Sequence, residues 1–214
     1  MRCKELATVA GLLVVSGCDG STAPTTPGAA ANAPPTVSIS SNPAGQAIVG
    51  VTTLTFTATG SDPNGDTLTY TWDVGEGVTG TGTTVSRLYK NEGSFPVSLT
   101  ASDGRGGTTT ARATAVVRSL SGAWTPLING VRQDPAALTQ EGSTLYGAVD
   151  SGCCKHTFAG EIAHPRSVTL EFRFSACKKR DLTFTGTVSA GLDRIETTGP
   201  NCNVPQTRFE FVRP

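Results

Sequence analysis

Residues 68–77 read Leu68-Thr69-Tyr70-Thr71-Trp72-Asp73-Val74-Gly75-Glu76-Gly77, and this stretch decides the fold of the first half of the chain. From Leu68 to Trp72, large apolar side chains alternate with threonine. Alternation with a period of two is typical of a strand that buries one of its faces. The stretch therefore predicts a β-strand with Trp72 in the core.

The same alternation recurs on both sides of this strand. It appears, with interruptions, in residues 37–39, 54–58, 97–101 and 109–117. Turn-forming residues separate the runs, at positions 62–66, 80–82 and 103–107. About seven short strands over residues 36–118 predict a two-layer β-sandwich of the immunoglobulin type, which carries its core tryptophan on a central strand.

The segment Trp72-Asp73-Val74-Gly75-Glu76-Gly77 resembles the Trp-Asp-Phe-Gly-Asp-Gly signature of PKD domains. A companion pattern follows it: Tyr89, Gly93, Phe95, Val97, Leu99, and Asp103 with glycines after it. Val74 and Glu76 depart from the signature but keep the character of their positions. The resemblance implies an Ig-like extracellular module for spacing, adhesion, or binding to proteins and sugars, which is not itself catalytic.

Residues 119–214 offer eight further strands joined by turns: 123–128, 136–140, 144–149, 157–163, 167–175, 182–189, 194–198 and 207–213. Eight sequential strands predict an up-and-down β-barrel that closes on itself and so removes its edges. We expect the interior to be filled by Leu145, Phe158, Ile162, Leu170, Phe172, Phe174, Phe184, Phe209 and Phe211.

The opening of this second unit, Leu120-Ser121-Gly122-Ala123-Trp124, resembles the start of avidin-like and lipocalin-like barrels. That resemblance implies an alternative function, a small-ligand carrier, which would need an open apolar cavity.

The N-terminus carries an export signal. Arg2 and Lys4 precede an apolar run from Leu6 to Val15, which is a basic region followed by a short apolar region. The ending Val15-Ser16-Gly17-Cys18 resembles the lipobox of bacterial lipoproteins, which implies a signal peptide over 1–17, cleavage before Cys18 and acylation of that cysteine. Residues 18–35 are small, polar and Pro-rich, which predicts a disordered linker. We therefore expect a lipid-anchored protein of the bacterial cell envelope, on its periplasmic or surface face.

Of the other cysteines, Cys3 lies in the predicted signal peptide and four lie in the second unit. In an eight-stranded meander, the connections after strands one, three, five and seven lie at the same end, and these connections hold Cys153, Cys154, Cys177 and Cys202. We call this end the cysteine rim. An exported protein favours disulfides. Adjacent Cys153 and Cys154 rarely bond each other, so each is predicted to pair with Cys177 or Cys202, in either combination. The alternative is a zinc site that includes His156, although no C-x-x-C spacing is present.

The rim also carries a group of cations: Arg132, Lys155, His156, Lys178, Lys179 and Arg180. The same connections carry three acids, Asp134, Asp150 and Asp181. Because these acids are fewer than the cations, the rim is predicted to be net positive. Such a rim could hold an anionic partner, an envelope glycan or a protein. The alternative is that these side chains are solvated and only add solubility. Asp62, Asn64, Asp66 and Asp73 have partial calcium-loop spacing, but Thr67 stands where glycine is required, so turn formation is favoured.

Composition limits the function further. The chain has 17 basic and 17 acidic residues and no basic stripe with interleaved aromatics, which argues against nucleic acid as a partner. No hydrolase, zinc-protease or nucleotide-binding motif is present, so no catalytic residue, metal or cofactor is predicted. The sequence favours a non-catalytic binding or adhesion module, with the ligand carrier and a cryptic envelope enzyme as alternatives.

Overall fold

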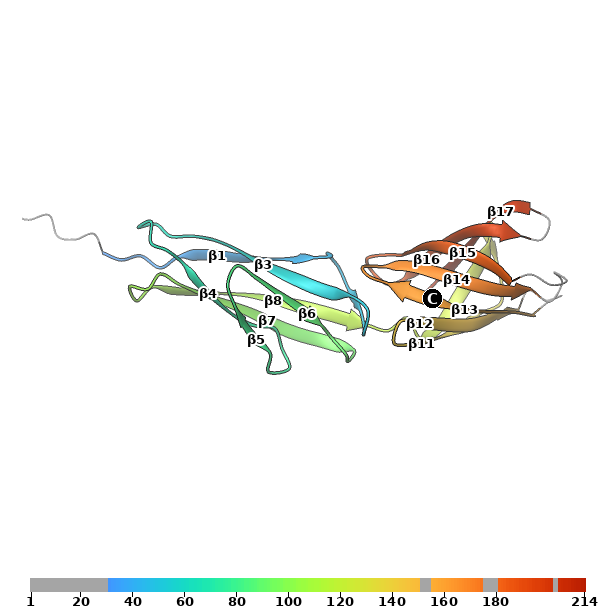
Figure 1. The fold of residues 1–214 in the computed structure, drawn as a ribbon, viewed down its shortest axis with the longest axis horizontal. Helices are drawn as coiled ribbons and strands as arrows, with labels where there is room; N and C mark the ends of the chain where they lie inside the picture. The colour runs from blue at the N-terminus through green and yellow to red at the C-terminus, as the bar shows by residue number, and fades with distance from the viewer. Residues whose placement is uncertain (1–30, 151–154, 175–180, 202–203) are drawn as a thin grey trace, which may run out of the picture. The chain divides into compact units, whose positions relative to one another are not determined.

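The computed structural model describes residues 31–150, 155–174, 181–201 and 204–214 of the 214-residue chain. These residues form a β-sandwich followed by a closed eight-stranded barrel, which confirms the predicted all-β fold (Figure 1). Within the described ranges, no helix has the length and apolar character needed to cross a bilayer. The predicted signal peptide, Cys18 and most of the linker lie outside them.

The sandwich contains β1 to β8 in two sheets. One sheet has the order β1-β3-β6 and the other β2-β8-β7-β4-β5. Only the short β2 runs parallel to its neighbour, β8, among these described pairings. The strands are β1 (Thr36–Asn42), β2 (Ala47–Ile48), β3 (Thr53–Ser61), β4 (Thr69–Asp73), β5 (Thr79–Thr81), β6 (Thr84–Leu88), β7 (Gly93–Ser102) and β8 (Thr108–Arg118).

Trp72 lies at the centre of the sandwich core, as predicted. Its side chain is 1% exposed, its ring centroid is 6.4 Å from that of Phe56, and its Nε1 donates a hydrogen bond to Gly82 O at 2.8 Å. Tyr89 is equally buried and donates to Val74 O at 2.8 Å, and burial raises the pKa of the Tyr89 hydroxyl to about 12. The polar atoms of these two core side chains therefore both have hydrogen-bond partners.

The turn after Trp72 explains the glycines of the signature. Gly75, Glu76 and Gly77 all have positive φ angles, of 83°, 51° and 72°. Glycine adopts this conformation without steric cost, whereas glutamate does so less readily. Contacts hold Glu76 in place, because its carboxylate accepts hydrogen bonds from Arg87 at 2.6 Å and Asn91 at 2.9 Å.

The barrel is a meander in which each strand pairs with the next. The strands are β9 (Gly122–Ile128), β10 (Val131–Arg132), β11 (Ala136–Glu141), β12 (Thr144–Asp150), β13 (Lys155–Ala163), β14 (Ser167–Phe174), β15 (Asp181–Val188), β16 (Arg194–Asn201) and β17 (Val204–Val212). Pairing of β17 with β9 closes the barrel, and β10 is a two-residue extension beside β9. The eight predicted strands are confirmed.

Phenyl rings fill the interior of the barrel. Phe172 lies 4.6 Å from Phe209 and 5.0 Å from Phe184 between ring centroids, and Phe158 lies 5.2 Å from Phe211. All five are at most 3% exposed. Leu145, Ile162 and Leu170 are buried with them as predicted, while the side chain of Phe174 lies outside the description. Burial of each ring contributes about 1.5–3 kcal/mol, so the interior works as a core.

Two glycines allow strands of the barrel to approach closely. A Cβ atom on Gly186 would lie 1.7 Å from Glu196 O, and one on Gly160 would lie 1.9 Å from Thr169 O. No side chain fits at such distances. Glycine inside a strand often marks a bend or a close approach of two backbones, and these two positions are of that kind.

Candidate functional site

The cysteine rim is defined in the structure by strand ends. β9 ends at Ile128, β12 at Asp150, β14 at Phe174 and β16 at Asn201, and the antiparallel pairings bring these ends together. Cys153 and Cys154 come soon after the end of β12, Cys177 after β14 and Cys202 after β16, but all four lie outside the described residues. The topology on which the disulfide argument depends is confirmed, and the disulfides stay a prediction.

The structure describes only part of the predicted cationic group. Arg132 lies in β10 and is exposed, and Lys155 opens β13. Lys178, Lys179 and Arg180 lie outside the described residues. Asp181, one of the acids at this rim, forms an ion pair with Arg173 at 3.4 Å, and both side chains are more than half exposed. Such an exposed pair contributes little stability, so it leaves both groups accessible to a partner.

His156 does not belong to the exposed surface of the rim. Its side chain is 7% exposed and lies on the same face of β13 as the buried Phe158. Burial lowers the pKa of His156, because the cation loses solvation, and the charge of Asp150 opposes this effect. The histidine therefore favours its neutral form, and it adds no surface charge for an anionic partner.

A hollow lies on the outer face of the barrel, over β13 and β14. It encloses about 520 Å³ and is lined mainly by small side chains, with Glu161 and Glu171 among them. Both glutamates are exposed. Its lining includes no histidine, lysine or cysteine, so these two glutamates are its ionisable groups.

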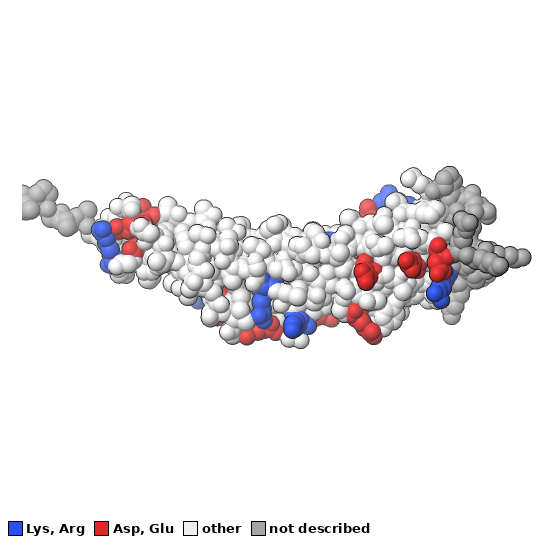
Figure 2. All heavy atoms as spheres, viewed as in Figure 1, with Lys and Arg blue, Asp and Glu red and all other residues white. Residues whose placement is uncertain are grey.

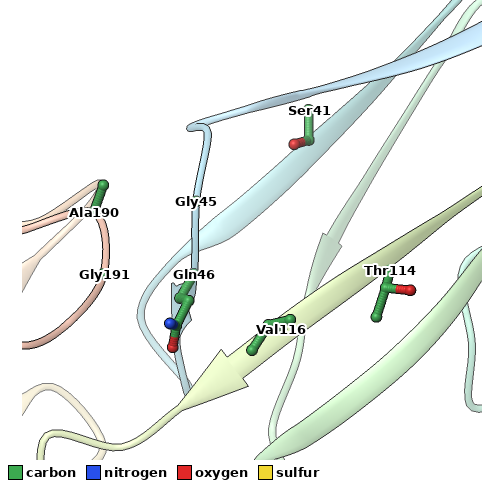
Figure 3. Close-up of a pocket in the computed structure, with 7 residues that line it drawn as sticks. All are labelled: Ser41, Gly45, Gln46, Thr114, Val116, Ala190 and Gly191. Atoms are coloured by element: carbon green, nitrogen blue, oxygen red, sulfur yellow. The ribbon is translucent and has the colours of Figure 1, made fainter.

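A second hollow, of about 540 Å³, is lined by both the sandwich and the barrel (Figure 3). Its lining residues are Ser41, Gly45, Gln46, Thr114, Val116, Ala190 and Gly191. None of these side chains is ionisable, so the hollow cannot transfer protons. Gln46 N donates to Ala190 O at 3.0 Å on one side of it, which ties the two halves together.

No tryptophan side chain is exposed in the described part of the chain, whereas Tyr70 and Tyr146 are half-buried. Trp72 and Trp124 are at most 1% exposed, and Leu88 and Val131 are the exposed large apolar side chains there. Charged side chains occupy small, separated groups on the face drawn in Figure 2. Stacking on tryptophan is therefore not the way in which this surface would bind a glycan.

The acidic residues of the sandwich form turns. Asp62 Oδ1 accepts hydrogen bonds from the backbone N–H groups of Asn64 at 2.8 Å and Asp66 at 3.2 Å. Asp73 Oδ1 accepts from Gly75 N at 2.9 Å. These contacts are the turn-forming role that the sequence favoured. Within the described residues, no group of three or more His, Cys, Asp or Glu side chains has an arrangement suited to a metal ion.

Comparison with known proteins finds matches for part of the chain. A family model described as PKD domain matches residues 32–118. A microbial collagenase from Vibrio alginolyticus is 41% identical over 70 residues, which span 32% of this chain and 9% of the collagenase. The chain thus matches less than a tenth of that relative's length.

Two solved structures also match. One is the PKD domain of an M14-like peptidase from Thermoplasmatales archaeon SCGC AB-540-F20, with 22% identity, 42% of this chain covered, all of that chain covered, and a TM-score of 0.35. The other is a carbohydrate-binding module of the β-sandwich superfamily, with 18% identity, 85% and 92% of the two chains covered, and a TM-score of 0.40.

Proposed function

Since residues 32–118 form a PKD domain, we propose that this chain is a non-catalytic spacer and binding module of the bacterial cell envelope. The lipidated Cys18 holds it on a membrane, the linker and the sandwich distance the barrel from that membrane, and the cysteine rim meets the partner. PKD domains are not themselves catalytic units.

The packed interior of the barrel is the observation that carries this proposal. Five phenyl rings with centroid separations of 4.6–5.2 Å occupy the space in which a lipocalin-like or avidin-like carrier would hold its ligand. A ligand would have to displace these rings, at a cost of several kcal/mol. We therefore expect binding to use the outer surface of the barrel. This disfavours the alternative of a small-ligand carrier.

An anionic envelope polymer or protein is the partner that best fits this surface. Lys178, Lys179 and Arg180 follow one another in the sequence between β14 and β15, and Arg132 is exposed on β10. Because no exposed tryptophan is available in the described residues, attraction between charges rather than stacking would supply the affinity. Such binding weakens as salt rises, since the charges are screened.

Co-sedimentation with purified peptidoglycan sacculi, which carry carboxylates, tests the proposal. We expect the full chain to sediment with sacculi at low salt and to be released at high salt. A variant with Lys178, Lys179 and Arg180 changed to glutamate should lose this binding. Arg112→Glu, on the exposed outer face of β8, is the control for a change of charge alone. Equal binding by the rim variant and the control would contradict the role of the rim.

A further inference from the structure

We propose that residues 44–53, here called the junction segment, join the sandwich and the barrel into one cooperative folding unit. The segment belongs to the PKD domain by sequence, yet it completes the core of the barrel. This inference concerns the folding and rigidity of the chain, and it does not depend on the partner proposed above. Asn32–Pro214 form a single compact unit, which is the starting point of the argument.

The short strand β2 contributes to two cores. Ala47 and Ile48 are both fully buried. Ala47 packs in the sandwich core with Trp72, whereas Ile48 packs in the barrel core with Trp124. Side chains of successive strand residues point to opposite faces. A strand that lies between two cores can therefore place one side chain in each core. Val51 of the same segment also packs against the barrel core.

Arg166 fixes the segment from the barrel side. It lies in the turn between β13 and β14, and its Nη2 donates to Ala44 O at 2.6 Å and to Gln46 O at 2.8 Å. Burial lowers the pKa of the guanidinium, and the Nε atom has no hydrogen-bond partner in the described structure. Removing a guanidinium from water is costly unless hydrogen bonds replace the lost solvation. The two bonds from Arg166 to backbone carbonyls supply such a replacement, which indicates a stable contact.

Two other parts of the barrel contact the segment. Gln140, at the end of β11, donates through Nε2 to Val49 O at 3.0 Å. Ala190, in the turn between β15 and β16, accepts from Gln46 N, and Gly45 approaches it so closely that a Cβ would lie 2.8 Å from Ala190 O (Figure 3). The segment is thus held from three sides of the barrel end.

Thr52 adds a polar bridge between the halves. It is 1% exposed, accepts a hydrogen bond from Ile48 N at 3.1 Å, and donates its own hydroxyl proton to Pro165 O at 3.0 Å. A valine of similar shape would leave both partners unpaired in a buried site. Buried hydrogen bonds of this kind are costly to break, which opposes separation of the halves.

The chain segment that connects the sandwich to the barrel, residues 119–121, is packed as well. Leu120 is fully buried in the barrel core, its carbonyl accepts from Trp124 Nε1 at 2.8 Å, and Arg213 donates to Ser119 O. Arg213 also lies over the Trp124 ring, 4.9 Å from its centroid. A flexible linker would be polar and solvated, so this connection cannot act as a hinge without unfolding part of the core.

The test is hydrogen exchange of the full oxidised chain, read by mass spectrometry over a urea series. Peptides from β7 and β8 report on the sandwich, and peptides from β13 and β14 report on the barrel. We expect one shared urea midpoint in the wild type. Two separate midpoints in the wild type would overturn the proposal outright, without reference to any variant.

Substitutions at the junction should separate the two halves. For the double variant Ile48→Ala/Arg166→Ala we expect two midpoints about 1 M urea apart. The matched control is Ile195→Ala/Arg173→Ala, in which a buried isoleucine and an exposed arginine of the barrel alone are lost. It should lower both midpoints together. If the junction variant does not fold, Arg166→Gln alone should still split the transition, and midpoints that stay together in it would contradict the proposal.

Discussion

Replacement of Trp72 by alanine should remove a large share of the stability of the sandwich and of the barrel joined to it. The side chain is 1% exposed and contacts Phe56 in a core that also contains Leu54, Val97 and Leu99. Truncation of a large buried aromatic costs about 3–5 kcal/mol, which is a large share of the 5–15 kcal/mol typical of a domain. Gly82 is exposed, so water replaces the lost indole donor at its carbonyl and adds little to this cost.

Urea unfolding followed by circular dichroism measures this loss. With a slope of about 1–3 kcal/mol per molar urea, the midpoint should fall by roughly 2 M. Thr71→Ala is the control, because Thr71 is the exposed neighbour on the same strand and its loss should change stability by less than about 0.5 kcal/mol. A loss below about 1 kcal/mol for Trp72→Ala would refute the placement of this ring in the core.

Four further predictions concern the anchor, the rim and the barrel. Labelled palmitate should enter the wild-type protein in its bacterial host but not Cys18→Ala, and equal labelling would exclude acylation there. Buried His156 has a lowered pKa, so stability is complete above the pH at which an unfolded histidine titrates, about 6.5, and falls as the pH drops below it. The melting temperature should therefore fall between pH 7 and pH 5, and His156→Gln should reduce that fall. An unchanged fall in the variant would show that other groups cause it. Gly186→Ala should destabilise the barrel by more than about 3 kcal/mol in urea unfolding, since its Cβ would meet Glu196 O at 1.7 Å, while Gly191→Ala in a turn serves as the mild control. Non-reducing peptide mapping should find no free thiol among Cys153, Cys154, Cys177 and Cys202. A bound metal with all four thiols reduced would overturn the predicted disulfides.

The strands were predictable because each has one buried face. Alternation in β14, from Val168 to Phe172, is a local signal, and one-sided burial in a barrel produces it directly. Turn residues then set the boundaries to within a few positions. The topology follows from short connections, which leave a meander as the simplest arrangement.

His156 shows where a local pattern was read with the wrong boundary. The sequence interpretation began the strand at residue 157, whereas β13 begins at Lys155. Two residues before the buried Phe158, the period of two places His156 on the inner face. The signal was present, but two cysteines and a lysine beside the histidine favoured an exposed connection.

The junction segment could not be predicted in the same way. Ile48 stands between Gly45 and Gly50, with too few residues for a periodic pattern. The role of the segment depends on contacts such as those of Ala44 and Gln46 with Arg166, more than a hundred positions away, and a single sequence contains no record of such contacts. Gly186 and Gly160 were also missed, because glycine is common in this chain, with 25 in total, and most of those in the described residues lie outside strands.

Closure of the barrel has a consequence for how such a unit can be combined with others. Since β17 pairs with β9, with Val212 opposite Thr125, the polypeptide enters and leaves the barrel at neighbouring points. Ends this close together are what insertion into a surface loop of a host requires, and the host would also have to supply what the junction segment supplies to the barrel core. The cysteine rim would then face away from the host, available to vary in sequence without disturbing the point of attachment.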